Sequence, residues 1–265
     1  ARGVVLSDVR YDEEAQAAQL LGFESIRLDA LDVSFRHPHY KSLGNIFKPA
    51  VDADLAWLPT LCARLLGVLE GVQIDTLYLP LGIGWHVDHM LTHTMAREWP
   101  VHQRLRYYED LPYGLLPHAT RLRLADLGWR STNPDASLAD PGLARAWATT
   151  ARAYARTAMV RNLNPWIVRK LAAPVVAAYL YRLMATHQRA QAAVPIQTWR
   201  SEVVPISAQF ALKVDAMQCY SSQFREFFID RADCEAQLRA YAAGFAPGAA
   251  MAERYWTPLP SGAMD

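Results

Sequence analysis

The first part of the chain alternates between short apolar runs and stretches with helical spacing. Residues 4–6 form a short β-branched run that ends in Ser-Asp, which predicts a buried strand followed by a turn. Residues 12–21 open with acidic side chains and continue with alanine and leucine, which predicts a helix that ends at Gly22. Residues 26–28 then predict a second strand.

The pattern that follows predicts a loop, a longer helix and a third strand. Residues 36–49 contain proline, glycine, asparagine and histidine without a period, which is typical of a loop. Leucines recur at helical spacing through residues 54–69, and residues 76–79 form an apolar run that Pro80 and Gly82 end. This alternation predicts an α/β fold with a mostly parallel, Rossmann-like sheet and helices on both faces.

The predicted strands bring several polar residues to one edge of the sheet. In open parallel sheets, ligands bind in the crevice beyond the carboxyl ends of the strands. Asp8, Asp32 and the segment after Leu79 all follow predicted strands. We therefore expect these segments to form a functional site.

An alanine-rich stretch, residues 141–193, predicts a helical insertion with breaks at Pro165 and Pro174. Residues 174–184 are apolar apart from Arg182, but this run is shorter than the ~20 residues that span a membrane. We expect the insertion to pack on the body of the protein or on a partner subunit of a homo-oligomer, with a peripheral membrane contact as the alternative. Residues 1–265 are then one domain that carries this insertion.

Composition excludes some classes of function. The 265 residues are 52% apolar, and 27 basic against 26 acidic residues create no global field for nucleic acid. The three cysteines, Cys62, Cys219 and Cys234, form no C-x-x-C pair, which favours a reducing, cytoplasmic location. The chain opens at Ala1 on a predicted strand, so we expect further sequence upstream of it.

The segment from Leu79 to His93 carries the strongest chemical signal. It follows a strand, passes through two glycines that allow the backbone to approach a ligand closely, and reaches His86, Asp88 and His89 at the expected start of a helix. The two histidines are three residues apart and share a helical face. One can bind a metal ion while the other faces a substrate oxygen, and Asp88 can orient a histidine.

Other interpretations of this segment remain open. A lone H-x-x-H is more often a feature of a surface or a helix cap than of a metal site. His93 lies four residues after His89, so an H-x-x-x-H zinc pair is also conceivable, although no third ligand is obvious nearby.

Several stretches, in order along the chain, resemble the PIG-L/LmbE family of zinc-dependent N-deacetylases. The run Gly84–His89 resembles the family signature H-P-D-H, or H-V-D-H in one branch. The further matches are Arg10-Tyr-Asp-Glu13 with its following A-A-x-x-L-G, Tyr108-Glu-Asp-Leu-Pro-Tyr113, Lys213 with Tyr220-Ser-Ser-Gln223, and Glu253-Arg-Tyr-Trp256. The similarity runs from about residue 3 to residue 258 and is weakest over residues 140–195.

The resemblance implies a role for each matched residue. His89 would bind zinc or another divalent metal, and His86 would act as an acid or stabilise the oxyanion with support from Asp88. Arg10 and Asp32 match residues that contact the sugar substrate, although without the family they could equally form a surface ion pair.

The resemblance assigns no catalytic role to the other matched stretches. Residues 108–110 form either a structural turn or a substrate contact. Lys213, Tyr220 and Gln223 are expected to pack and cap helices.

The sequence also departs from the family. The A-H-P-D-D loop, which supplies two metal ligands and the catalytic base, is absent, together with the first strand and helix. The only His-Pro step is His37-Pro38, which runs into His39 and Tyr40. Either an upstream segment supplies the loop, or the protein is a metal-free relative, or His37 or His39 substitutes.

These features give two functional hypotheses. The first is a zinc-dependent hydrolase that removes an acetyl group from an N-acetylglucosamine-type sugar or glycoconjugate. The alternative is a non-catalytic, metal-free sugar-binding or scaffold protein of the same fold.

Overall fold

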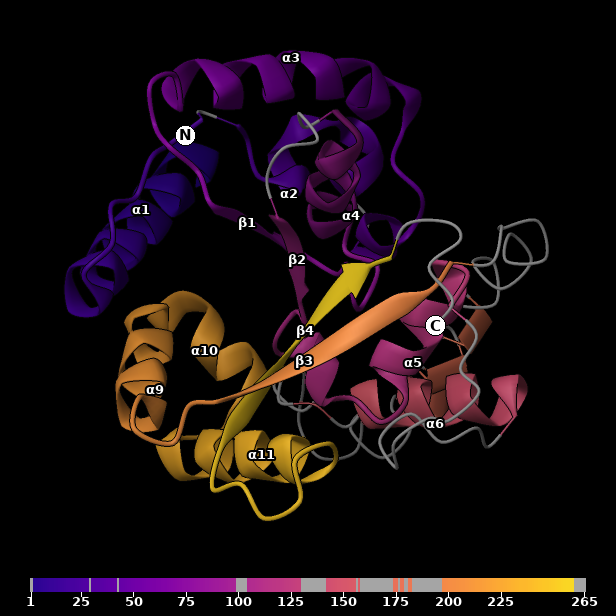
Figure 1. Ribbon diagram of the computed structural model, residues 1–265. Coiled ribbons are helices and arrows are strands. Elements are labelled where there is room, and N and C mark those ends of the chain that lie inside the picture. Colours follow the sequence, from indigo (N-terminus) through magenta and orange to yellow (C-terminus); the bar gives the residue numbers. More distant parts are fainter. Residues whose placement is uncertain are drawn as a thin grey trace. The chain divides into compact units, whose positions relative to one another are not determined.

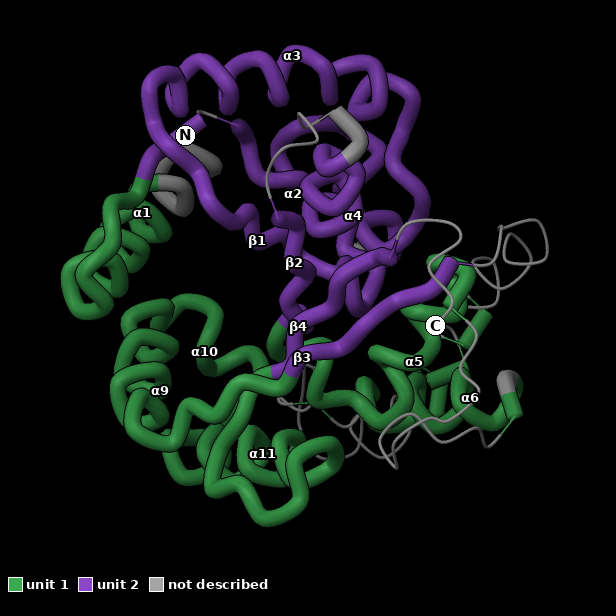
Figure 2. Tube along the Cα trace, in the orientation of Figure 1, with its two compact units in different colours: residues 1–25, 111–196, 203–253 green, residues 26–110, 197–202, 254–265 purple. Residues whose placement is uncertain are grey.

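The computed structural model describes residues 2–28, 30–41, 43–98, 104–129, 142–155, 157, 174–175, 177–178, 181–182 and 197–259. The chain divides into two compact units, each built from several segments (Figure 2). Unit 1 contains residues 1–25, 111–196 and 203–253, and unit 2 contains residues 26–110, 197–202 and 254–265. The prediction of one domain over residues 1–265 stays a prediction.

The elements follow one another as shown in Figure 1. The helices and helical turns are α1 (Arg2–Leu21), α2 (Val33–Arg36), η1 (Pro38–Lys41), η2 (Leu43–Phe47), α3 (Asp52–Val68), α4 (Val87–Thr94), η3 (Met95–Glu98), η4 (Tyr113–Leu115), α5 (Ala119–Asp126), α6 (Leu143–Tyr154), α9 (Phe210–Cys219), α10 (Ser221–Phe227) and α11 (Arg231–Ala243). The strands are β1 (Thr76–Pro80), β2 (Arg104–Tyr108), β3 (Trp199–Pro205) and β4 (Ala252–Pro258).

The protein is a mixed α/β chain with an open four-stranded sheet in the order β1-β2-β4-β3. Strands β1 and β2 are parallel, with Thr76 opposite Arg104 and Pro80 opposite Tyr108. Strand β4 runs antiparallel to β2, with Trp256 opposite Tyr107. The sheet is therefore mixed, and the prediction of a mostly parallel, Rossmann-like sheet is not confirmed.

Two predicted strands are wrong. Residues 4–6 lie inside helix α1, and residues 26–28 form neither helix nor strand. A run of three apolar residues is too short to distinguish a strand from a helical turn. No proline interrupts the chain from Arg2 to Leu21, and its one glycine, Gly3, lies in the first turn, where it does not break the helix, so the helix predicted for residues 12–21 extends back to Arg2. The prediction that Asp8, Asp32 and the segment after Leu79 follow strands that end at one edge of the sheet is therefore also wrong, because Asp8 lies within this helix.

Several other predictions are confirmed. Gly22 ends α1 with a positive φ of 72°, and the backbone N–H groups of Gly22 and Phe23 both donate to Ala18 O, at 2.8 and 3.1 Å. Helix α3 and strand β1 lie where leucine spacing and the apolar run predict them. The loop predicted for residues 36–49 is not among the confirmed predictions, because most of this stretch forms the 3-10 helical turns η1 and η2.

In unit 2, helix α4 connects the sheet to helix α3. It contacts β1 on one side and α3 on the other, and its buried residues Val87 and Leu91 share one face with Met95, which follows it. Met95 packs against Leu58 and Cys62 of α3. This apolar spacing fixes the rotation of α4, so the start of the helix has a defined orientation relative to the end of β1.

In unit 1, helices α9 and α11 form an apolar core against which Phe224 and Phe227 of α10 pack, and α1 packs on α9 and α10. The carboxylate of Glu13 on α1 accepts bonds from the Ser222 backbone N–H at 2.7 Å and from the hydroxyls of Ser221 and Ser222 at 3.0 and 2.6 Å. Because Ser221 opens α10, the acid lies at the positive end of that helix.

The helical insertion predicted for residues 141–193 is described only in part. Helix α6 forms its first section, whereas most of the stretch, including Pro165, lies outside the described residues, so the insertion stays a prediction. Among the residues that the structure describes, no helix is long and apolar enough to cross a membrane.

Candidate functional site

A buried loop carries the chain from the end of β1 to the histidine pair. Residues 81–85 are all buried, and the Leu81 N–H donates to Tyr108 O at 2.9 Å, which extends the pairing with β2 beyond the strand. Gly82 and Gly84 both have a φ of 84°, and Trp85 has a φ of 59°. A tryptophan in this left-handed region is unusual, and such local strain is often found at functional sites.

Asp110 joins this loop to the second histidine. Its Oδ2 accepts the backbone N–H groups of Gly82 and Ile83 at 2.8 and 2.9 Å, and its Oδ1 lies 2.6 Å from His89 Nδ1. The residue is only 1% exposed. A carboxylate at this distance favours the proton on His89 Nδ1, so in the neutral ring the lone pair lies on Nε2, as in histidines that bind metal ions.

His86 has the opposite arrangement. It is the N-cap residue of α4, and its Nδ1 accepts the backbone N–H of Asp88 at 3.3 Å. A neutral imidazole that accepts a hydrogen bond at Nδ1 carries its proton on Nε2. The side chain of His86 is therefore a hydrogen-bond donor at Nε2.

The two histidines lie side by side at the surface. Their ring centroids are 5.3 Å apart, and both residues are half-buried. The structure thus brings together the residues expected to donate to substrate and to bind metal, His86 and His89. One ring offers an N–H group and its neighbour offers a lone pair, a combination that suits polarising a carbonyl group and activating water.

The other histidines near this site have structural contacts. His93 Nδ1 lies 3.0 Å from Pro80 O at the end of β1, and its ring contacts that of Tyr107. His37 Nδ1 accepts the backbone N–H of His39 at 3.1 Å. Over the described part of the chain, no group of three histidine, cysteine, aspartate or glutamate side chains could hold a metal ion. His89 with Asp110 suits one metal ligand, but these residues do not form a complete catalytic zinc site, which takes three protein ligands.

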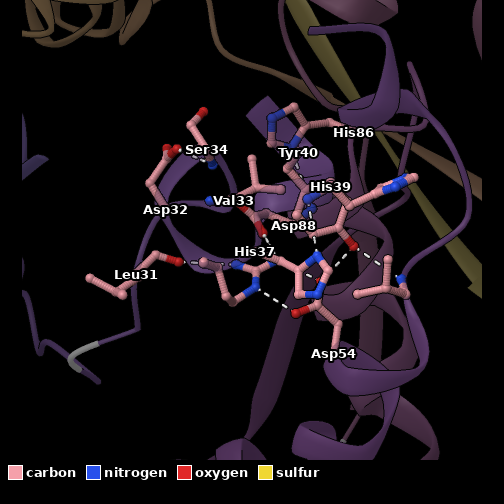
Figure 3. Close-up of polar contacts among 12 residues, drawn as sticks. Leu31, Asp32, Val33, Ser34, His37, His39, Tyr40, Asp54, His86 and Asp88 are labelled. Atoms are coloured by element: carbon pink, nitrogen blue, oxygen red, sulfur yellow. Dashed lines mark hydrogen bonds and ion pairs between the residues drawn. The ribbon is translucent and has the colours of Figure 1, made fainter. Parts of the chain in front are cut away.

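Asp88 contacts His86 through its backbone, as described above, and its carboxylate binds helix α2. Oδ1 lies 2.7 Å from an Arg36 guanidinium nitrogen, and Oδ2 accepts the Val33 N–H at 3.2 Å. Figure 3 shows Asp88 among residues of α2 and η1, with His86 close by.

Arg36 also binds the buried carboxylate of Asp54, at 2.7 and 3.1 Å, and Asp54 accepts the Tyr40 hydroxyl at 2.7 Å. Burial tends to raise the pKa of Asp54, but the bonds from Arg36 and Tyr40 outweigh it, so its pKa is lowered. Burial and the Asp54 carboxylate raise the pKa of Tyr40 to about 12. Arg36 and Asp54 therefore form an ion pair, and the neutral Tyr40 hydroxyl donates one further bond to Asp54.

The two expected sugar contacts lie in different units. Asp32 caps α2 in unit 2, where its carboxylate accepts the Ser34 N–H at 2.9 Å, and the next residue, Val33, binds Asp88. Arg10 lies on α1 in unit 1. Burial tends to raise the pKa of Glu13, but the bonds from the two serines and, to a smaller extent, the charge of Arg10 lower it. Burial raises the pKa of Glu226, and the charge of Arg10 opposes this effect.

Sequence reasoning missed the importance of Asp110 and of Arg36. Asp110 follows β2, the parallel neighbour of β1, so its place could have been found by recognising that Arg104–Tyr108 alternates in polarity and forms a strand. Arg36 gave no comparable signal, because its partners Asp54 and Asp88 are 18 and 52 residues away in sequence.

Neither the protein-family models and curated proteins compared with the sequence nor the solved structures compared with the fold gave a match. The resemblance to the PIG-L/LmbE deacetylases therefore depends on the motifs in the sequence.

Proposed function

We propose that this chain provides the histidine part of an amide hydrolase site that removes the acetyl group from an N-acetylglucosamine-type sugar or glycoconjugate. The main observation in favour is the histidine pair, in which His86 offers an N–H group 5.3 Å, ring to ring, from the lone-pair histidine His89. Amide hydrolysis requires both a donor for the developing oxyanion and a group that binds or deprotonates the attacking water.

Each histidine has a separate part in this proposal. His86 Nε2–H donates to the acetyl oxygen as it becomes the tetrahedral oxyanion, and removing one such donor typically lowers kcat by about 10²–10³-fold. His89 Nε2 either accepts a proton from water or binds a metal ion, and both uses require the tautomer that Asp110 favours. Because the described residues offer no complete zinc site, we assign no step to a metal.

The stretches that carry the family resemblance also contact one another, which supports the proposal. In unit 1 the Arg10–Glu13 stretch binds the Tyr220–Gln223 stretch through Glu13 and Ser222, and Lys213 pairs with Glu253. In unit 2 Glu109 accepts from Arg254 and Trp256 at 2.6 and 2.8 Å, next to the Asp110 that binds His89. Segments matched independently in sequence thus meet in space.

The test is release of acetate from 2-acetamido sugars and their glycosides, with and without added zinc. We expect His86→Gln to lower the rate of release by about 10²–10³-fold and His89→Gln to abolish release. Asp75→Asn, at an exposed site of the same unit, should leave it unchanged. Release that persists in both histidine variants would exclude this site as the centre of the reaction.

A second candidate is a metal-free sugar-binding or scaffold protein of the same family. It applies if no other segment of the protein supplies an A-H-P-D-D loop, because the described residues alone group no three side chains that could hold a metal ion. Calorimetry with the same sugars distinguishes the candidates, because binding without acetate release supports this function and turnover excludes it.

A further inference from the structure

Both ends of the single-turn helix α2 bind the carboxylate of Asp88. The N–H group of Val33, its first residue, donates to Oδ2 at 3.2 Å, and Arg36, its last residue, binds Oδ1 at 2.7 Å. Asp88 lies in the first turn of α4. The position of that first turn is therefore tied to α2 by two bonds from different groups.

Arg36 is itself held on several sides. Its Nε and one terminal nitrogen bind both oxygens of Asp54 at 2.7 and 3.1 Å, and its other terminal nitrogen donates to Leu31 O at 3.0 Å. Its guanidinium carbon lies 5.9 Å from the ring centroids of Tyr40 and Trp57. The Arg36 side chain is only 13% exposed, so it has little freedom to leave these partners.

We infer that Arg36 is a positioning residue for His86. The backbone N–H of Asp88 is the group that binds His86 Nδ1, at 3.3 Å, so whatever fixes the first turn of α4 also fixes the direction of this donor. Arg36 does so by binding the carboxylate of the same residue. It thereby keeps His86 in the tautomer that carries its proton on Nε2.

This inference rests on the proposed function only in describing His86 Nε2–H as the group that faces substrate. The state of the ring can be measured without substrate or metal, so failure of the inference and failure of the proposed function give separate results.

The experiment is ¹⁵N NMR of the histidine side chains of the full chain at a pH above the usual imidazole pKa of about 6.5. His86→Gln assigns the signals of His86 by removing them. In the unaltered protein we expect separate resonances for an unprotonated Nδ1 and a protonated Nε2. In Arg36→Gln we expect both to shift toward their mean, because the ring exchanges between tautomers. Arg64→Gln is the matched control, since Arg64 is exposed and donates only a long 3.5 Å bond to Leu28 O among its described contacts.

A second variant keeps the test decisive if Arg36→Gln does not fold. The double variant Arg36→Gln/Asp54→Asn removes the buried carboxylate that would otherwise lose its partner, and leaves Asp88 without the arginine. Separate His86 resonances in either folded variant would overturn the inference. Loss of folding in both would also count against it, because Arg36 would then hold the unit as a whole. Where acetate release is measurable, kcat should fall in the folded variant with KM retained.

Discussion

Replacing Asp110 with asparagine tests how the His89 side of the site is held. Asp110 is 1% exposed and binds two backbone N–H groups, from Gly82 and Ile83, besides His89. A hydrogen bond to a charged group contributes about 1.5–3 kcal/mol, against about 0.5–1.5 kcal/mol for a neutral one. Asparagine keeps the shape and loses the charge, so each backbone bond should weaken by about 1 kcal/mol.

The His89 bond contributes less to stability, because the His89 side chain is 34% exposed. We therefore expect Asp110→Asn to lower the free energy of unfolding by about 2–3 kcal/mol. Asp110→Ala leaves two buried N–H groups unpaired and should cost about 4 kcal/mol, since each unpaired group costs about 1–3 kcal/mol. Urea unfolding followed by tryptophan fluorescence measures the free energies of unfolding of both variants. Asp75→Asn is the exposed control, and the variants can be compared if their m values are unchanged.

The same variant has a chemical consequence that stability alone does not show. The asparagine amide group can donate to His89 Nδ1, which moves the ring proton to Nε2 and removes its lone pair. In a Ser-His-Asp triad, the equivalent change lowers kcat on the order of 10⁴-fold. We expect a comparable loss of acetate release, together with an inverted His89 tautomer by ¹⁵N NMR. The reasoning is refuted if Asp110→Asn is within about 0.5 kcal/mol of the unaltered protein or retains the Nδ1–H tautomer.

Three further predictions concern other buried groups. Arg254→Met should lower the free energy of unfolding in urea by about 3–5 kcal/mol, because the buried Glu109 carboxylate would lose its arginine and keep the Trp256 indole N–H as a neutral donor. Adding Glu109→Leu should restore most of this loss, and equal stability of the single and double variants would contradict the prediction. Burial tends to raise the pKa of Glu13, but the bonds from two serines lower it, so the contribution of Glu13 to the free energy of unfolding is complete above pH 4.5 and is lost as the pH falls below that value. Glu13→Gln should therefore make urea unfolding less dependent on pH in this acid range, and an unchanged pH profile would count against this. Burial and two neighbouring acidic residues raise the pKa of Cys234 to about 11. At pH 8 a thiol reagent should therefore modify the half-buried Cys219 before Cys234, as followed by mass spectrometry, and equal rates of modification would contradict this.

The parts of the fold that the sequence predicts well are long or sharply bounded. Helix α3 has leucines at helical spacing over several turns, and β1 ends in a proline followed two residues later by a glycine. The two wrong strand predictions concern runs of only three residues. Residues 4–6 continue into a helical sequence, and residues 26–28 have too few apolar positions to fix a pairing partner.

For the site, sequence reasoning succeeds where contacts are local and fails where they are distant. His86 and His89 are neighbours because α4 begins between them, which the glycine-rich loop and the i, i+3 spacing predict. The carboxylate expected to orient a histidine was Asp88, but the one bound to the metal-ligand candidate is Asp110, 21 residues after His89. That pairing depends on β2 lying beside β1, and the sequence pattern used above predicts no strand at residues 104–108.

The histidine pair is held by two carboxylate systems that come from different elements. Asp110 reaches His89 from the end of β2, and the Arg36–Asp88 pair reaches His86 through the start of α4. Stability alone does not explain this arrangement, because buried ion pairs are often no more stabilising than apolar side chains of similar size. By their hydrogen-bond geometry, the two systems instead favour opposite proton positions on two adjacent rings. Surface histidines without a chemical role would not require this, and the arrangement is therefore the strongest structural argument that these two side chains act together on one ligand.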